Sequence, residues 1–357
     1  MTTGVQFHPL TVASVDPLTD ESVAVTFDVP DHLREAFRYL PGQHVTVRKE
    51  IDGHDVRRSY SICANANVGT LRVGIKRLTG GAFSTWATTG LEAGDVIDVT
   101  PPGGEFTIDS TTDWGHHHCA IVAGSGITPV LSLVSTTLDS DPASYWTVIY
   151  GNRAARTVMF LDELEGLKDR YPDRLQIVHV LSREDPGLDL FAGRIDAAKL
   201  QSLFAGVVDA ERIDRWFLCG PYEMVTGARQ LLIERGVAPE HVRDELFFAG
   251  PLVTPPAPPP IGEKGTVRLT VILDGRASEV QMRPETSVLD AAMSVRSELP
   301  YSCKGGMCAT CKAKVIEGDV RMDKNYALVD SDLAQRFVLT CQSHPTSDRL
   351  VVDYDQR

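Results

Sequence analysis

Four cysteines near the end of the chain constrain its fold more than any other feature. Three lie in the stretch YSCKGGMCATCKAKV, spaced Cys303-x4-Cys308-x2-Cys311, and Cys341 follows after 29 further residues. Three thiolates on one loop and a fourth from a distant segment form the spacing that binds a 2Fe–2S cluster. We therefore predict that these four cysteines are metal ligands on a cluster-binding loop.

Zinc is the alternative metal for such a segment. Structural zinc sites favour a pair of C-x2-C knuckles. This chain has one C-x2-C, and Cys341 has no second cysteine beside it. Adjacent Gly305 and Gly306 would also let the loop bend sharply and turn its amides toward sulfur. These features favour the cluster over zinc.

The composition bounds the class of protein and its location. A chain of 357 residues, 43% hydrophobic and 23% charged, is typical of a soluble protein with two or three domains. No apolar run approaches the roughly 18 residues that cross a bilayer, and no secretory signal pattern is visible. Seven cysteines, an odd number, indicate the reducing cytoplasm, and a net charge of −13 argues against nucleic acid as a partner.

One linker divides the chain. Between residues 251 and 260 there are six prolines, which favour a semi-rigid extended spacer. The remaining sequence pattern changes again near residue 110. We therefore expect domains at 1–110, 111–250 and 265–357, with the linker at 251–264.

The three domains differ in their predicted elements. The first has short alternating stretches with polar turns, which indicate a closed antiparallel β-barrel. The second alternates strands and helices, as in a parallel α/β sheet, and the third opens with a hairpin and a helix. The predicted strands are 22–29, 43–50, 57–63, 70–78 and 95–102 in the first domain and 119–124, 146–152, 175–182 and 215–220 in the second. The predicted helices are 128–138, 157–171 and 221–236, and the third domain has a hairpin at 266–282 and a helix at 286–295.

Some candidate residues have a simpler structural interpretation. His116, His117 and His118 are consecutive, so they cannot all face one metal ion on a strand, and we expect them at a solvated strand start. Cys63 and Cys119 sit in apolar strands and are expected in the core.

A phosphate-binding turn is the strongest motif of the second domain. The stretch CAIVAGSGITPVLSL runs from a strand through Gly124 and Gly126 into a helix with Pro129 in its first turn. Glycines let the backbone approach a pyrophosphate, and the helix N-terminus adds donors. The third glycine of the usual dinucleotide fingerprint is missing, so a tight structural turn is the alternative.

Other strand ends of the same domain carry polar groups. YGNR ends at Arg153 and VLSRED contains Ser182 and Arg183, where the carboxyl ends of parallel strands bind ligands. A hydroxyl and two arginines suit the 2′-phosphate of NADPH, although ordinary surface salt bridges are the alternative. FLCGP places Cys219 at a third strand end, either as a core residue or in contact with the nicotinamide.

Together the motifs GSGITP, YGNR, CGP and RSYS resemble the ferredoxin–NADP reductase superfamily, and the tail resembles its β-grasp 2Fe–2S ferredoxin domain. The resemblance implies FAD in the barrel and NADPH as the electron-donating substrate. It implies flavin binding by Arg58, Tyr60 and Ser61, with Tyr60, Ser61 and Cys219 in the catalytic site. The implied cofactor-binding residues continue with Gly81, Ala82, Ser84, Gly124, Gly126, Thr128, Pro129, Arg153, Ser182, Arg183, Cys219 and Gly220.

The order of the modules narrows the resemblance. Flavin, nucleotide and C-terminal ferredoxin domains resemble the reductase components of multicomponent oxygenases. With ELPYSCKGGMCATCK and DKNYAL, the chain is most similar to the reductase subunits of phenylacetyl-CoA epoxidases. This implies electron flow from NADPH through FAD and the 2Fe–2S cluster to a di-iron oxygenase in phenylacetate degradation. Alternatives are the reductase of a steroid or aromatic-ring hydroxylase and a stand-alone NAD(P)H diaphorase or quinone reductase.

Overall fold

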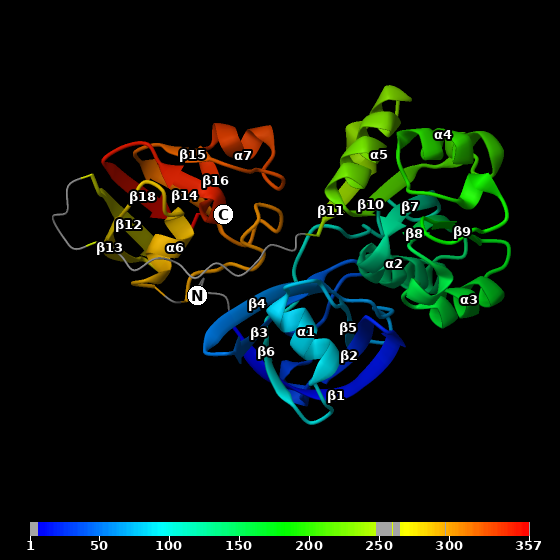
Figure 1. Cartoon of the computed structure of the whole chain (residues 1–357), viewed down its shortest axis with the longest axis horizontal. Helices are drawn as coiled ribbons and strands as arrows, with labels where there is room; N and C mark the ends of the chain where they lie inside the picture. Colours follow the sequence, from blue (N-terminus) through cyan, green and yellow to red (C-terminus); the bar gives the residue numbers. More distant parts are fainter. Residues whose placement is uncertain (1–5, 248–258, 260–264, 297, 357) are drawn as a thin grey trace.

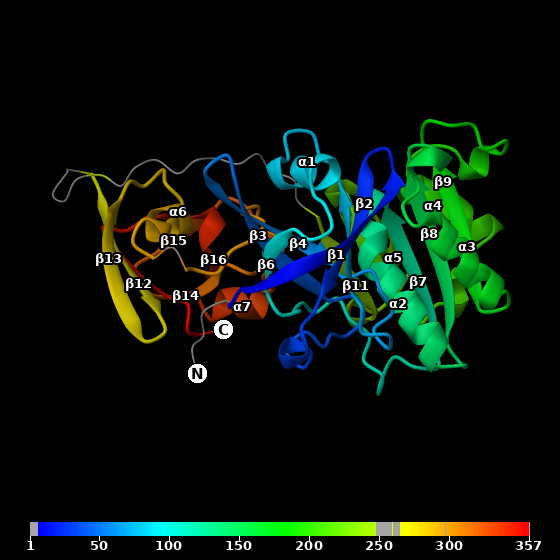
Figure 2. The ribbon, with the colours of Figure 1, turned by 90° about the horizontal axis from the view of Figure 1, so that it is seen from below.

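The computed structural model describes residues 6–247, 259, 265–296 and 298–356, which form three domains (Figure 1). An antiparallel β-barrel is followed by a parallel α/β domain and a mixed-sheet domain. In the view from below, the barrel lies between the other two domains (Figure 2). The predicted fold class is confirmed. Apart from Pro259, the predicted linker at 251–264 lies outside the described residues.

The barrel is a six-stranded antiparallel sheet of order β4-β3-β6-β1-β2-β5. A bridge between Ile62 and Val73 joins its two edges and closes it. Alternating apolar side chains fill its interior, among them Leu10, Val25 and Val47. Its elements are β1 (His8–Thr19), β2 (Ser22–Asp28), a 3-10 turn (Asp31–Leu33), β3 (His44–Ile51), β4 (His54–Ser61), β5 (Leu71–Lys76), α1 (Ala82–Thr89) and β6 (Val96–Val99).

The second domain is a five-stranded parallel sheet of order β11-β10-β7-β8-β9. Helices α2 and α3 pack on one face, and α4 and α5 on the other. Its strands are β7 (His117–Ala123), β8 (Tyr145–Asn152), β9 (Leu175–Leu181), β10 (Arg215–Gly220) and β11 (Val242–Leu246). Its helices are α2 (Ile127–Ser140), α3 (Leu161–Arg170), α4 (Ala197–Gly206) and α5 (Tyr222–Glu234), with 3-10 turns at Gly124–Gly126, Ala155–Thr157, Asp189–Phe191, Ala210–Arg212 and Pro239–His241.

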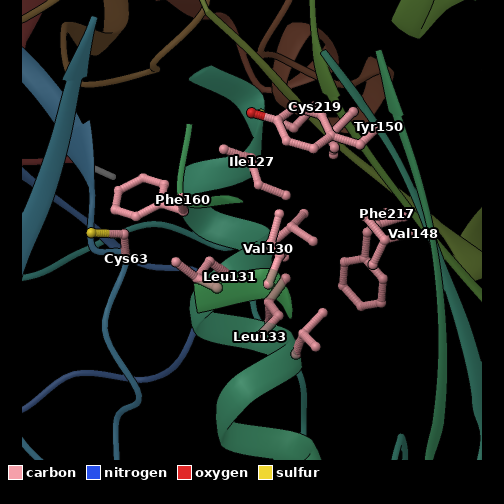
Figure 3. Packing of buried hydrophobic residues seen from close by; sticks show 14 of the residues in the cluster. Cys63, Ile127, Val130, Leu131, Leu133, Val148, Tyr150, Phe160, Phe217 and Cys219 are labelled. Atoms are coloured by element: carbon pink, nitrogen blue, oxygen red, sulfur yellow. The ribbon is translucent and has the colours of Figure 1, made fainter. Parts of the chain in front are cut away.

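One hydrophobic core joins the barrel to the parallel domain. Helix α2 lies between them, with Leu131 near Cys63 of the barrel and Val130 and Leu133 facing Phe217 of the sheet (Figure 3). Cys63 and Cys119 are both buried, as predicted. Because the two domains share a core, their relative position is set by packing.

The third domain has its own core and a mixed sheet of order β13-β12-β18-β14-β16. Its opening hairpin turns at Asp274 and Gly275, both with positive φ, as a two-residue hairpin turn requires. The side chain of Ser287 caps α6 by accepting from the Asp290 amide. The elements are β12 (Val267–Leu273), β13 (Arg276–Met282), α6 (Val288–Met293), β14 (Lys312–Glu317), β15 (Val320–Met322), α7 (Asp330–Ala334), β16 (Phe337–Leu339), a 3-10 turn (Thr340–Gln342), β17 (Ser343–Pro345) and β18 (Arg349–Asp353).

Two expectations about local structure are wrong. The helix predicted from residue 157 begins at Leu161, because Phe160 has a φ of 58° and its ring lies against Gly74 of the barrel. The solvated strand start is wrong for His118, which is fully buried and stacks 4.8 Å from the Trp146 ring. Burial lowers the pKa of His118 to about 4, so the neutral imidazole serves as a core side chain.

The sequence predicts no membrane-spanning segment, and the helices of the structure test this expectation. Across the described ranges, none of them combines the length and the apolar character needed to span a bilayer.

Candidate functional site

The four predicted metal ligands come together at one end of the third domain. Pairing of Lys312 with Leu339 between β14 and β16 brings the segment after β16 alongside Cys311. Both the amide and the hydroxyl of Thr340 donate to the Cys311 carbonyl, at 3.3 and 2.9 Å. The sheet register therefore delivers Cys341 to the loop that holds the other three cysteines.

The thiols form two pairs. The Cys303 amide donates to Cys308 Sγ at 3.5 Å, and the two side chains are hydrogen-bonded to each other. Cys311 is likewise hydrogen-bonded to Cys341, which raises the pKa of Cys311. In the described ranges, no three His, Cys, Asp or Glu side chains surround a single ion site. Two pairs fit a 2Fe–2S cluster, in which each iron takes two thiolates.

The loop stabilises the thiolate form of one cysteine, Cys303. The Gly305 amide donates to Cys303 Sγ at 3.3 Å. The Cys308 thiol and the backbone amides of the loop lower the pKa of Cys303 to about 6. Gly306 has a φ of 81°, and a Cβ there would lie 3.0 Å from the Lys324 carbonyl oxygen. The glycine therefore serves a tight bend, as the sequence predicts.

The predicted flavin residues lie on β4 and at the start of α1. Arg58 and Tyr60 are half-buried, and the Tyr60 ring lies 5.7 Å from the Phe83 ring of α1. Ser84 Oγ accepts from the Leu78 amide and donates to the Gly81 carbonyl. An aromatic ring such as that of Tyr60 suits the flat isoalloxazine ring of FAD, and a helix N-terminus suits the FAD pyrophosphate. The residues present therefore fit FAD.

The predicted pyrophosphate turn has the close packing that its glycines suggest. A Cβ on Gly126 would lie 2.2 Å from the Cys219 carbonyl oxygen, so β10 passes directly against the turn. Gly124 has a φ of 56°. The Thr128 hydroxyl donates to the Ser125 carbonyl at 2.9 Å, and Pro129 follows in the first turn of α2. The role of this turn and of the α2 N-terminus in binding a pyrophosphate stays a prediction.

The strand ends that carry arginine are adjacent. The Ser182 amide donates to the Asn152 carbonyl at 2.9 Å, and the Arg183 amide to the Arg153 carbonyl at 2.8 Å. Both arginines are exposed, and Arg153 pairs with Glu21 of the barrel at 3.7 Å. Their role toward a 2′-phosphate stays a prediction, since this pairing is also an ordinary surface ion pair.

Cys219 is fully buried in the shared core beside Gly220, and burial raises the pKa of its thiol. A contact with the nicotinamide through its backbone or sulfur stays a prediction. The same junction holds a residue that sequence patterns did not indicate, Glu245 on β11. Ser61 Oγ donates to Glu245 Oε2 at 3.3 Å, and Glu245 Oε1 lies 3.7 Å from His44 Nδ1.

A second residue that sequence patterns did not indicate is Lys76 at the end of β5. Its ammonium lies 3.6 Å from where a Cβ on Gly124 would be. Burial, followed by repulsion from Arg153, lowers the pKa of Lys76. No sequence motif marks either residue. Lys76 reaches the turn at Gly124, and Glu245 reaches Ser61 on β4, through tertiary packing alone.

Comparison with known proteins supports each domain separately. Residues 9–108 match the model of an oxidoreductase FAD-binding domain, and residues 120–230 match an oxidoreductase NAD-binding domain. Residues 271–346 match a 2Fe–2S iron-sulfur cluster binding domain. The fold resembles phthalate dioxygenase reductase, with a TM-score of 0.62 and 21% identity over 97% of this chain and 98% of that one.

The fold and the site thus define an oxidoreductase that carries FAD and a 2Fe–2S cluster and takes electrons from a nicotinamide nucleotide. The chain is 41% identical to a component of the 1,2-phenylacetyl-CoA epoxidase of Escherichia coli (strain K12), over 98% of both chains. It is 30% identical to the ferredoxin reductase component of 3-ketosteroid-9-alpha-monooxygenase of Rhodococcus rhodochrous, over 97% of this chain and 96% of that one. The chain belongs to the family of that 1,2-phenylacetyl-CoA epoxidase component. It is a reductase of the kind that supplies electrons to an oxygenase.

Proposed function

We propose that this chain supplies electrons from NADPH to a di-iron oxygenase that epoxidises the ring of phenylacetyl-CoA in the cytoplasm. The observation that carries the proposal is the 41% identity that extends through all three domains. The bound cofactors supply the redox chemistry, since a flavin accepts a hydride and can pass its two electrons singly to a cluster. The protein supplies binding, orientation and insulation from solvent.

The residues divide these tasks between domains. Tyr60 packs against the flavin ring, and Arg58 and Ser61 bind its polar parts. The turn at Gly124 and Gly126 places the nucleotide so that its nicotinamide reaches the flavin. Because Ser61 and Glu245 meet at the barrel–sheet junction, they border the place where the two rings would face each other.

The experiment is a coupled assay with purified oxygenase components. With the di-iron oxygenase and phenylacetyl-CoA, we expect epoxide formation in step with NADPH oxidation. Product formed with a steroid 9-hydroxylase component alone would favour the second candidate, to which the 30% identical relative points. Quinone reduction at full rate, with no oxygenase accepting electrons, would instead favour a stand-alone diaphorase.

Substitution of Arg183 tests the nucleotide preference. In Arg183→Ala we expect the KM for NADPH to rise about tenfold, because a charge-assisted bond to the 2′-phosphate is lost. The KM for NADH should change less than twofold in steady-state assays. Arg170→Ala, an exposed arginine at the end of α3, is the control and should alter neither value. Equal losses for both nucleotides would remove the 2′-phosphate role of Arg183.

A further inference from the structure

The third domain is held against the barrel by contacts that the proposed electron path does not use. Arg57 on β4 is 3% exposed, although it carries a full charge. Its Nη1 donates to the Leu299 carbonyl at 3.1 Å, while Nε and Nη2 donate to Asp55. Its guanidinium also lies 4.5 Å from the Tyr301 ring centroid. The ion pair with Asp55 lies within the barrel, whereas the contacts with Leu299 and Tyr301 exist only while the two domains stay together. Separation of the domains would leave part of this guanidinium without its polar partner.

A second contact lies two residues further along the same strand. Ser59 Oγ and Ser302 Oγ are 2.7 Å apart, and Ser302 is 1% exposed. Ser59 stands between Arg58 and Tyr60, the predicted flavin residues, and Ser302 directly precedes Cys303. The hydrogen bond therefore joins the chain neighbours of both redox sites.

The other side of the cluster loop touches the parallel domain. The rings of Tyr222 and Tyr326 lie 4.8 Å apart, and the Tyr326 amide donates to the Gly306 carbonyl at 3.0 Å. The loop is thus held before Cys303 by the barrel and after it by helix α5. Figure 1 shows the third domain placed against β4 in this way.

We propose that Arg57 and Ser59 are positioning residues that dock segment 299–302 on the flavin strand and so set the cluster loop for electron transfer. The inference rests on the proposed function, which needs the flavin of the barrel and the cluster of the third domain to be held close together. With both cofactors bound, each transfer across this junction would move one electron from the flavin to the cluster. The cluster would pass that electron to the external acceptor before it took the second electron of the hydride, and the remaining proton would pass to solvent.

The first test separates flavin reduction from cluster reduction in the holoenzyme under anaerobic stopped flow. In Arg57→Ala we expect NADPH to reduce the flavin at the normal rate and the cluster about tenfold more slowly, since a charged hydrogen bond and a cation–π contact are lost. Arg57→Lys should fall between, because it keeps the charge without the fork. Equal slowing of both steps would show a general defect of the barrel and overturn the proposal.

Arg48 provides the matched control. It lies opposite Arg57 on β3, pairs with Asp98 at 2.7 Å as Arg57 pairs with Asp55, and its hydrogen bonds stay within the barrel. Arg48→Ala should leave both rates unchanged. Cluster reduction slowed as much as in Arg57→Ala would contradict a specific docking role.

A double-mutant cycle tests the serine pair with little risk to folding. Ser59→Ala and Ser302→Ala should each slow cluster reduction about fivefold, and the double variant should be no slower, because one shared bond is lost. If the double variant instead slowed cluster reduction by the product of the two single effects, the two serines would act independently and the Ser59–Ser302 hydrogen bond would not matter for transfer.

A third measurement needs no electron transfer. Small-angle X-ray scattering of the oxidised holoenzyme should give a larger radius of gyration for Arg57→Ala than for Arg48→Ala, as the third domain leaves the barrel. Unchanged scattering together with unchanged cluster reduction would refute the docking contact. None of these measurements uses an oxygenase, so their failure is distinguishable from the failure of the proposed partner.

Discussion

The Cys308→Ser variant should lose cytochrome c reduction by NADPH almost entirely while NADPH still bleaches its flavin. Cys308 contacts Cys303 in the loop, and since it is a predicted ligand, its loss would leave one iron with a single thiolate of the pair. A hydroxyl is a poor substitute, because iron–sulfur clusters are held by thiolates. Visible absorption, iron content and acid-labile sulfide of protein prepared without oxygen would measure the loss directly.

Survival of flavin reduction in this variant follows from the separate cores. The third domain packs around its own hydrophobic cluster, whereas the barrel and the parallel domain share another. Met307→Leu, next to the ligand and of similar volume, is the control and should retain iron and electron transfer. Should Cys308→Ser lose flavin reduction as well, the domains would not act as independent modules.

The second large effect is expected from Gly126→Ala. Position 126 has an ordinary helical φ of −61°, so the effect is steric. The new methyl would lie 2.2 Å from the Cys219 carbonyl oxygen and 2.7 Å from its carbon, both backbone atoms that cannot swing away. Forcing α2 away from β10 should cost about 3 kcal/mol. The calorimetric midpoint of the two-domain body should then fall by about 6–12 °C.

Nucleotide binding should weaken in the same variant. The turn from Gly124 to Gly126 and the start of α2 are the predicted pyrophosphate site, and displacing them should raise the Kd for NADP⁺ at least about tenfold in isothermal titration. Gly227→Ala is the control, since a Cβ there meets nothing within 4 Å and alanine favours the helix. Equal effects at both positions would show that the close approach of β10 is not the cause.

Much of the architecture was predictable from local pattern. Alternating strands indicate the barrel, strand–helix alternation indicates the parallel sheet, and Asp274-Gly275 marks the hairpin turn that the structure has. The long strand β1 lacks a clear alternating pattern and was missed. The start of α3 was misplaced because the fit of Phe160 against Gly74 overrides helix propensity.

The candidate site divides in the same way. Cysteine spacing marks the cluster loop, since ligand geometry constrains a short segment directly. Glu245 and Lys76 carry no such mark, because each lies far in sequence from the groups it faces. The burial of His118 was also hidden, as a polar residue at a strand start gives no sign of the rings of Trp146 and Phe217 that enclose it.

By itself the sequence determined the three domain types and predicted which four cysteines are cluster ligands, because backbone turns and ligand spacing are local properties of the chain. Only the tertiary structure decided how the domains meet: a shared core around α2, the Ser61–Glu245 contact, and Arg57 buried against Leu299 and Tyr301. The Arg57–Leu299 hydrogen bond, for example, joins residues 242 positions apart, and the stability of such contacts depends on shape and pairing that no local pattern encodes.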